Sequence, residues 1–182
     1  MGHAKQDAVF QPLNIAVLTV SDTRTLETDT SGDTLQQCVV DTGHRLWGRE
    51  IRPDCIYQLR AVVSQWIAHP DVHVVLVTGG TGFTPRDTTP EALTPLFDKQ
   101  IDGYGELFRQ ISYEEIGTST VQSRAVAGVA NRTVVFAMPG SPKACKTAWT
   151  RVIQEQLDAR HRPCNFVEMV MPEVNSACGT RA

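Results

Sequence analysis

The amino-acid sequence predicts an α/β domain of three layers (α/β/α), with helices on both faces of a mainly parallel central sheet. Two observations lead to this fold class. Residues 15–20, 72–78 and 133–138 are nearly continuous apolar runs rich in β-branched residues, as in strands that helices cover on both faces. The segments between these runs carry apolar residues at helical spacing. This strand–helix–strand order predicts parallel strands joined by right-handed crossovers.

A fourth, weaker strand is predicted over residues 44–51. Arg45, Arg49 and Glu50 interrupt its apolar pattern. A strand that carries charged residues is expected nearer the edge of the sheet, where one side of it meets solvent.

Three helices are predicted from apolar residues that share one helical face. The three faces consist of Leu35, Cys38, Val39 and Thr42; of Ile56, Leu59, Val63, Trp66 and Ile67; and of Cys145, Ala148, Trp149, Val152 and Ile153. Ser141 followed by Pro142 predicts a capped start for the third helix.

Further helical segments are predicted with less regular patterns. Thr88 is expected to be the N-cap of a helix, with Glu91 placed to complete a capping box. Residues 123–128 are small and are predicted to be helical, packed in the core or against another subunit. Residues 103–109 contain two glycines and are expected to break and restart a helix. Glu106 and Arg109 of this segment would face a ligand or pair with each other.

The whole chain suits one domain. Its 182 residues divide into a flexible N-terminal arm (1–13), a ligand-binding domain (14–168) and a flexible C-terminal tail (169–182). A net charge of −3 and the lack of a basic stripe argue against a nucleic-acid partner. No run approaches the roughly 18–20 apolar residues that span a bilayer. The first residues also lack the features of a signal peptide, so no membrane contact and a cytoplasmic location are expected.

The five cysteines are widely spread and form no C-x-x-C pair. This odd number in a chain of this length is typical of reduced thiols rather than of a disulfide framework. No ligand pair shows the spacing of a zinc site.

Polar and glycine-rich segments follow the three strong strands. In open α/β sheets, ligands bind beyond the carboxyl ends of the strands, so the chemistry is expected just after Val20, Thr78 and Met138. The loops there consist of Ser21 and Asp22; of Thr78, Gly79, Gly80, Thr81 and Gly82; and of Pro139, Gly140 and Ser141.

The glycine loop at residues 78–82 is the sharpest of these features. Its glycines permit positive φ values and let backbone N–H groups approach a ligand, while Thr78 and Thr81 add hydroxyls. The glycine spacing differs from a Walker loop and from G-x-G-x-x-G. A plain strand-to-helix turn is the alternative, and the position after a buried strand favours a ligand loop. The turn at residues 139–141 would offer a phosphate the free N–H groups of a helix start, or it is simply a capped helix.

Four acidic residues lie near these loops: Asp22, Asp54, Asp87 and Glu106. Asp54 follows the weak strand, and Asp87 closes the glycine loop, so both are expected at the same edge of the sheet. Mg²⁺ takes one or two carboxylates and keeps several waters, which makes Asp54 and Asp87 candidate magnesium ligands. A surface charge or a helix cap is the alternative for either residue alone.

Seven motifs, in this order, resemble the MoaB/MogA family of molybdenum-cofactor biosynthesis proteins. They are L-T-V-S-D at 18–22, D-T-S-G at 29–32, T-G-G-T-G at 78–82, R-D-x-T-P-E-A at 86–92, G-E-x-F-R at 105–109, S-R-A at 123–125 and P-G-S-P at 139–142. Residues 116–120 and 162–166 look like the bacterial MoaB branch.

The resemblance implies a three-layer molybdopterin-binding fold, assembled as a homotrimer or hexamer. It also implies adenylylation of molybdopterin by Mg-ATP with release of pyrophosphate, before the metal is inserted, and no tightly bound prosthetic group. By the same analogy, Asp54 and Asp87 are catalytic and position Mg²⁺. The loops at 78–82 and 139–141 would hold the pterin phosphate, and Ser21, Asp22 and Glu106 would contact nucleotide or pterin.

Two other functions are weighed against this nucleotidyltransferase. A non-catalytic molybdopterin-binding or assembly protein would need the glycine loop but neither Asp54 nor Asp87. A generic dinucleotide-binding domain would need a G-x-G-x-x-G motif after the first strand, and residues 21–24 do not supply one.

Overall fold

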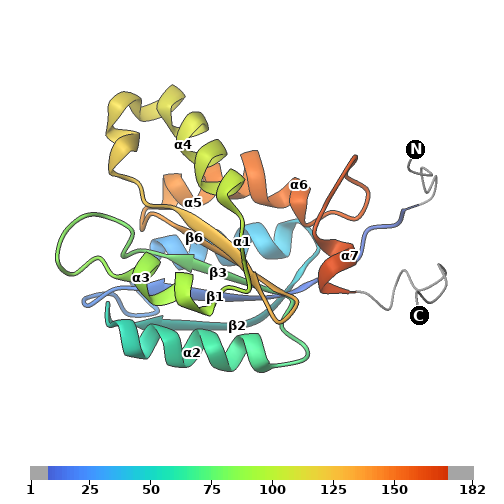
Figure 1. Ribbon diagram of the computed structural model, residues 1–182, viewed down its shortest axis with the longest axis horizontal. Helices are drawn as coiled ribbons and strands as arrows, with labels where there is room; N and C mark the ends of the chain where they lie inside the picture. The colour runs from blue at the N-terminus through green and yellow to red at the C-terminus, as the bar shows by residue number, and fades with distance from the viewer. Residues whose placement is uncertain (1–7, 172–182) are drawn as a thin grey trace.

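The structure is a computed structural model that describes residues 8–171 (Figure 1). Over these residues six strands form one sheet in the order β2-β1-β3-β6-β5-β4. Neighbouring strands are parallel from β2 to β6, and β5 and β4 continue the sheet in antiparallel pairs. The strands are β1 (Asn14–Val20), β2 (Arg45–Arg52), β3 (Val74–Thr78), β4 (Lys99–Gln100), β5 (Val126–Ala130) and β6 (Thr133–Met138).

Helices cover both faces of this sheet, as Figure 1 shows. On one face lie α1 (Thr30–Asp41), α4 (Asp102–Ile116), α5 (Pro142–Ala148), its π-helical continuation η3 (Trp149–Ile153) and α7 (Val167–Val170). On the other face lie α2 (Ile56–Ala68) and α3 (Thr89–Leu93), followed by the short η1 (Thr94–Leu96). The 3₁₀ segment η2 (Gly117–Gln122) follows α4, and α6 (Gln154–Gln156) follows η3.

The central strands are buried on both faces, which explains their continuous apolar sequences. Along β1, Ile15 and Val17 pack into the cluster under α1 and α5, whereas Ala16 and Leu18 pack into the cluster over α2. Burial of each large aliphatic side chain contributes roughly 1.5–3 kcal/mol. The three-layer, mainly parallel α/β fold predicted from the sequence is therefore confirmed, with β2 at the edge of the sheet.

Residues 123–128 were predicted to be helical, and this is wrong. Residues 126–130 form β5, which pairs with β6. The small residues are needed by the sheet, because a Cβ on Gly128 would lie 2.2 Å from the Phe97 ring. A run of alanine, valine and glycine has no clear period, so it does not distinguish a helix from a strand.

The predicted break in one helix and the predicted capping box of another are also wrong. Helix α4 runs without a break over Asp102–Ile116. Its Gly105 allows the helix to pack closely on the segment before β5, since a Cβ there would lie 2.6 Å from Ala125 O. At α3, Thr88 is the N-cap residue as predicted, but its side chain makes no cap hydrogen bond and the capping box does not form. Thr88 Oγ1 donates to the Asp54 carboxylate, and Glu91 pairs with Arg124.

Of the predicted arm (1–13) and tail (169–182), residues 1–7 and 172–182 lie outside the described residues. Within the described part, Leu13 is fully buried and its N–H donates to His44 Nδ1 at 3.1 Å. Helix α7 spans the predicted boundary at residue 168, and Val170 is buried in the core.

Candidate active site

The carboxyl ends of β1, β3 and β6 lie side by side, because these strands are neighbours in the sheet. The loops that follow them are therefore in contact. Thr78 Oγ1 donates to Pro139 O at 3.1 Å, and a Cβ on Gly140 would lie 3.1 Å from Gly79 Cα. The Thr78 hydroxyl is thus engaged within the protein, where it also lies 3.1 Å from Cys145 Sγ. This contact leaves the backbone of the loop, rather than the Thr78 side chain, to meet a ligand.

The glycine loop requires its glycines. Gly79 and Gly80 have φ values of +104° and +64°, a region that other residues rarely adopt. A Cβ on Gly79 would lie 2.3 Å from Val20 O, and one on Gly80 would lie 2.4 Å from Asp54 Oδ2. Thr89 fixes the loop from α3 by donating from its hydroxyl to Gly79 O (2.8 Å) and from its N–H to Gly80 O (3.0 Å).

Asp54 lies directly against this loop. Its Oδ1 accepts hydrogen bonds from the N–H of Thr88 at 3.1 Å and from the Thr88 hydroxyl. Burial raises the pKa of Asp54, the nearby carboxylates of Asp87 and Asp22 raise it further, and the two bonds from Thr88 oppose this shift. The site therefore holds a carboxylate whose negative charge is incompletely compensated.

Asp87 lies against the same loop at Gly82, where a Cβ would be 2.8 Å from its Oδ2. That same oxygen accepts from the Thr84 hydroxyl at 2.6 Å and from the Thr84 N–H at 2.8 Å. The hydrogen bond from the Thr84 side chain is the main reason that the pKa of Asp87 is lowered. Asp87 is consequently held in its ionised form.

Asp22 joins the two segments that carry Asp54 and Asp87. Its Oδ1 accepts from the N–H of Asp54 at 3.2 Å, and its Oδ2 accepts from Arg86 Nη2 at 2.6 Å and Nε at 3.1 Å. The hydrogen bond from Arg86 is the main cause of the lowered pKa of Asp22. The neighbouring Ser21 hydroxyl shapes the same loop, because it accepts from the N–H of Arg24 at 3.1 Å.

Arg124, which sequence reasoning did not place in the site, frames the glycine loop from the start of β5. Its Nε donates to Gly82 O at 2.7 Å and its Nη2 donates to Asp87 O at 2.8 Å, while its own N–H donates to Thr81 O at 3.1 Å. The S-R-A motif marked this residue, but the helix predicted there concealed its role. The same holds for Thr88, which was interpreted only as a helix cap.

A narrow cavity of about 140 Å³ opens beside the turn at residues 139–141, between α4 and α5. Phe108, Ile116 and Ala144 give it apolar walls. The buried Ser123 Oγ at its wall has no hydrogen-bond partner among the described residues. At its rim, Lys143 Nζ lies 3.1 Å from Glu115 Oε2, which ties α5 to α4.

Ser141 and Glu106, the two other predicted ligand contacts, lie in different environments. Ser141 caps α5, because its Oγ accepts from the N–H of Ala144 at 3.2 Å, and it also lines the narrow cavity. Glu106 lines a separate cavity of about 270 Å³ beside β4 and β5, none of whose lining residues belongs to the three loops. Arg109 donates to Ala125 O at 3.3 Å, and the described residues show no ion pair between Arg109 and Glu106.

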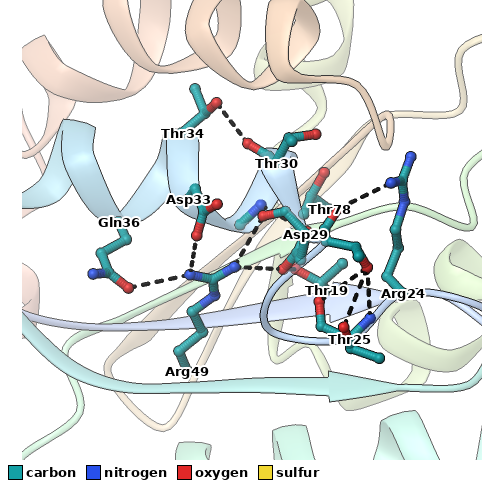
Figure 2. Close-up of polar contacts among 12 residues, drawn as sticks. Thr19, Arg24, Thr25, Asp29, Thr30, Asp33, Thr34, Gln36, Arg49 and Thr78 are labelled. Carbon is teal, nitrogen blue, oxygen red and sulfur yellow. Dashed lines mark hydrogen bonds and ion pairs between the residues drawn. The ribbon is translucent and has the colours of Figure 1, made fainter.

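A second carboxylate cluster, of Asp29 and Asp33 around Arg49, lies at the start of α1 (Figure 2). Asp29 is only 1% exposed and accepts from Thr19 Oγ1 at 2.6 Å, from Gly32 N at 2.9 Å and from Arg49 Nη2 at 2.8 Å. Arg49 also pairs with Asp33 at 2.6 Å. This cluster anchors α1 to β1 and β2, and so fixes the base of the loop that carries Ser21 and Asp22.

The carboxylates at the loops fit a magnesium ion bound mainly through water. Within residues 8–171 no three His, Cys, Asp or Glu side chains converge as a complete metal cage. Mg²⁺ needs only one or two carboxylates. The bonds from Thr88 use Oδ1 of Asp54 and those from Thr84 use Oδ2 of Asp87, so each carboxylate keeps its second oxygen apart from these bonds. Both carboxylates lie against the glycine loop, Asp54 at Gly80 and Asp87 at Gly82.

The fold and the place of the loops define a class: three-layer α/β domains with a mainly parallel sheet, in which ligands bind beyond the carboxyl ends of the strands. Residues 16–159 match the family described as "Probable molybdopterin binding domain". This match covers most of the chain, which therefore belongs to that family.

Known relatives share most of the chain. It is 59% identical over 157 residues to molybdenum cofactor biosynthesis protein B of Escherichia coli (strain K12), which covers 86% of this chain and 92% of that protein. It is 44% identical over 142 residues to the protein of the same name from Bacillus subtilis (strain 168), covering 78% and 84%. The resemblance drawn from the seven motifs is thereby confirmed.

Solved structures agree with the fold. A crystal structure of molybdenum cofactor biosynthesis protein B superposes with a TM-score of 0.79 at 44% identity, covering 81% of this chain and 92% of that one. The tungsten cofactor synthesizing protein MoaB from Pyrococcus furiosus gives 0.71 at 36% identity, covering 80% and 92%. Among residues 8–171, none of the helices combines the length and the apolar character that a membrane span requires.

Proposed function

We propose that this protein binds molybdopterin and adenylylates it with Mg-ATP, giving adenylyl-molybdopterin and pyrophosphate. The observation that carries the proposal is the placement of Asp54 and Asp87 against the glycine loop, at Gly80 and Gly82 respectively, with the charge of Asp54 incompletely compensated. Perturbed carboxylates at a ligand loop are typical of functional sites. A protein that only binds the pterin would need the glycine loop but neither of the two carboxylates.

The reaction needs no covalent intermediate on the protein. A terminal phosphate oxygen of molybdopterin forms a bond to the α-phosphorus of ATP. The bond from that phosphorus to the bridging oxygen breaks, and pyrophosphate leaves with the electron pair. The chain's task is to hold two anions in line and to offset their repulsion.

The loops divide this task. The N–H groups of the glycine loop and of the turn at 139–141 would face the reacting phosphates, because both loops lie at the same sheet edge. Asp54 and Asp87 would hold Mg²⁺, which when bound neutralises phosphate charge. Thr88 and Thr84 fix the two carboxylates by hydrogen bonds and so set the geometry before a substrate arrives.

The narrow cavity between α4 and α5 suits the flat pterin ring. Its apolar walls and the unpartnered Ser123 hydroxyl match a heteroaromatic ring with polar edges. The cavity adjoins Pro139 and Ser141, so a ring bound there would place its phosphate next to the loops.

The test is pyrophosphate release from Mg-ATP, with and without molybdopterin, in the parent protein and in Asp87→Asn. Release should depend on the pterin and fall at least about 100-fold in the variant, the usual loss for one electrostatic group of a catalytic site. Asp71→Asn is the matched control, because Asp71 is exposed at the opposite, amino edge of β3 and should leave the rate unchanged. Pterin binding without release in the parent would leave a binding protein of the same family.

A further inference from the structure

Three carboxylates lie at the site: Asp22, Asp54 and Asp87. Among the described residues, Arg86 is the arginine whose side chain forms an ion pair with one of them. It pairs with Asp22, whereas Arg124 binds backbone carbonyls and Glu91. Asp22 holds this exposed guanidinium, and Asp54 lies within reach of its charge, whereas Asp87 is under the influence of Arg124. These negative charges repel a polyphosphate unless cations offset them. How tightly the anion binds therefore depends on whether Arg86 pairs with Asp22 or with the polyphosphate.

The geometry of the Arg86–Asp22 pair would allow Arg86 to exchange Asp22 for another anion. The side chains of Arg86 and Asp22 are 67% and 41% exposed, and ion pairs this exposed are held only weakly. Nε and Nη2 of Arg86 both donate to one oxygen, Asp22 Oδ2. Its Nη1 has no hydrogen-bond partner among the described residues. A guanidinium prefers a bidentate contact with two oxygens, which a phosphate offers.

Asp22 would remain in place when Arg86 leaves. Its other oxygen accepts the N–H of Asp54, and this bond does not involve Arg86. Arg86 itself sits in the short segment between the glycine loop and α3, next to Asp87. A change of rotamer would therefore move the positive charge while both carboxylates keep their positions.

We propose that Arg86 is a shuttling cation: it pairs with Asp22 in the free protein and transfers to the polyphosphate of the nucleotide in the complex. This inference rests on the proposed function for the identity of the anion. It assigns to Arg86 a positioning role and to Asp22 the role of a competitor that holds the guanidinium until the nucleotide arrives.

The test measures binding of ATP and of inorganic tripolyphosphate by calorimetry in excess EDTA, so that no metal takes part. Arg86→Gln should weaken both about tenfold, as expected for loss of a charged hydrogen-bonding partner. Arg45→Gln is the control, because Arg45 is exposed at the amino end of β2 and should bind like the parent.

Asp22→Asn separates the shuttle from a merely structural clamp. If Asp22 competes for Arg86, its neutralisation should strengthen binding about two- to fivefold, and this gain should shrink when Arg86→Gln is already present. If the pair only ties two loops together, Asp22→Asn should weaken binding as Arg86→Gln does, and the proposal is overturned. Unchanged affinity in Arg86→Gln overturns it equally.

The two proposals can fail separately. Anion binding that depends on Arg86, in a protein that shows no pterin-dependent pyrophosphate release, would uphold the shuttle and sink the adenylyltransferase. Pterin-dependent release with the same Michaelis constant for ATP in Arg86→Gln would uphold the enzyme and sink the shuttle.

Discussion

Two carboxylate clusters lie near the carboxyl edge of the same sheet, and they differ in how their charge is compensated. Asp29 is buried, but hydrogen bonds from Thr19, Arg49 and Gly32 outweigh its burial and lower its pKa. Among residues 8–171, the Asp54 carboxylate accepts hydrogen bonds from Thr88 alone, and burial together with two neighbouring carboxylates raises its pKa. The first cluster is built to stabilise the fold, whereas the second keeps an unfavourable charge that a bound cation or ligand would relieve.

The first prediction breaks the unfavourable cluster. Asp54→Asn should lower pterin-dependent pyrophosphate release by about 10³-fold, because it removes a charge that the reaction requires. The same change should raise the free energy of unfolding by up to about 1 kcal/mol, since the amide oxygen of the new side chain still accepts from Thr88 without carrying a charge. Steady-state kinetics and urea unfolding on one preparation measure both effects. A variant that is inactive and also less stable would show that Asp54 is structural.

The second prediction breaks the compensated cluster. Asp29→Asn should cost about 3 kcal/mol of unfolding free energy, because Arg49 would be left as a largely buried cation with one partner fewer. The folded fraction should keep its pyrophosphate release at saturating substrate. Urea unfolding checks the stability, and Asp33→Asn is the matched control, because its exposed pair with Arg49 should contribute much less.

Much of the fold could be predicted from the sequence, because a strand covered on both faces has a continuous apolar sequence of its own. The run at 133–138 forms a strand of the same bounds, since both of its faces are covered by helices. The segment at 123–128 has no such continuous run of large apolar residues. Its small residues fit a strand only because Phe97 and α4 pack against them, and these contacts come from distant parts of the chain.

The candidate site was predictable to the extent that strand ends define it. The positions of Asp54, Asp87 and the glycine loop at one edge follow from the order of strands and loops. The partners of the carboxylates do not follow from it. Thr88 reaches Asp54 across 34 residues, and Arg86 reaches Asp22 across 64, so only the folded chain shows which charges are compensated.

The last prediction sharpens the comparison through pH. Asp54 has a raised pKa in the folded protein, so its ionised form destabilises the fold at neutral pH, and this cost disappears as the pH falls through the folded pKa towards 3.8. Asp29 has a lowered pKa, so its stabilising effect is complete above 3.8 and is lost as the pH falls through the folded value. The stability gain of Asp54→Asn should therefore vanish on acidification, starting above pH 3.8. The penalty of Asp29→Asn should persist to pH 3.8 and shrink only below it. Urea unfolding of both variants and the parent from about pH 7 to about pH 3 measures the two windows, and gains and penalties that fade over the same window would refute the contrast between the clusters.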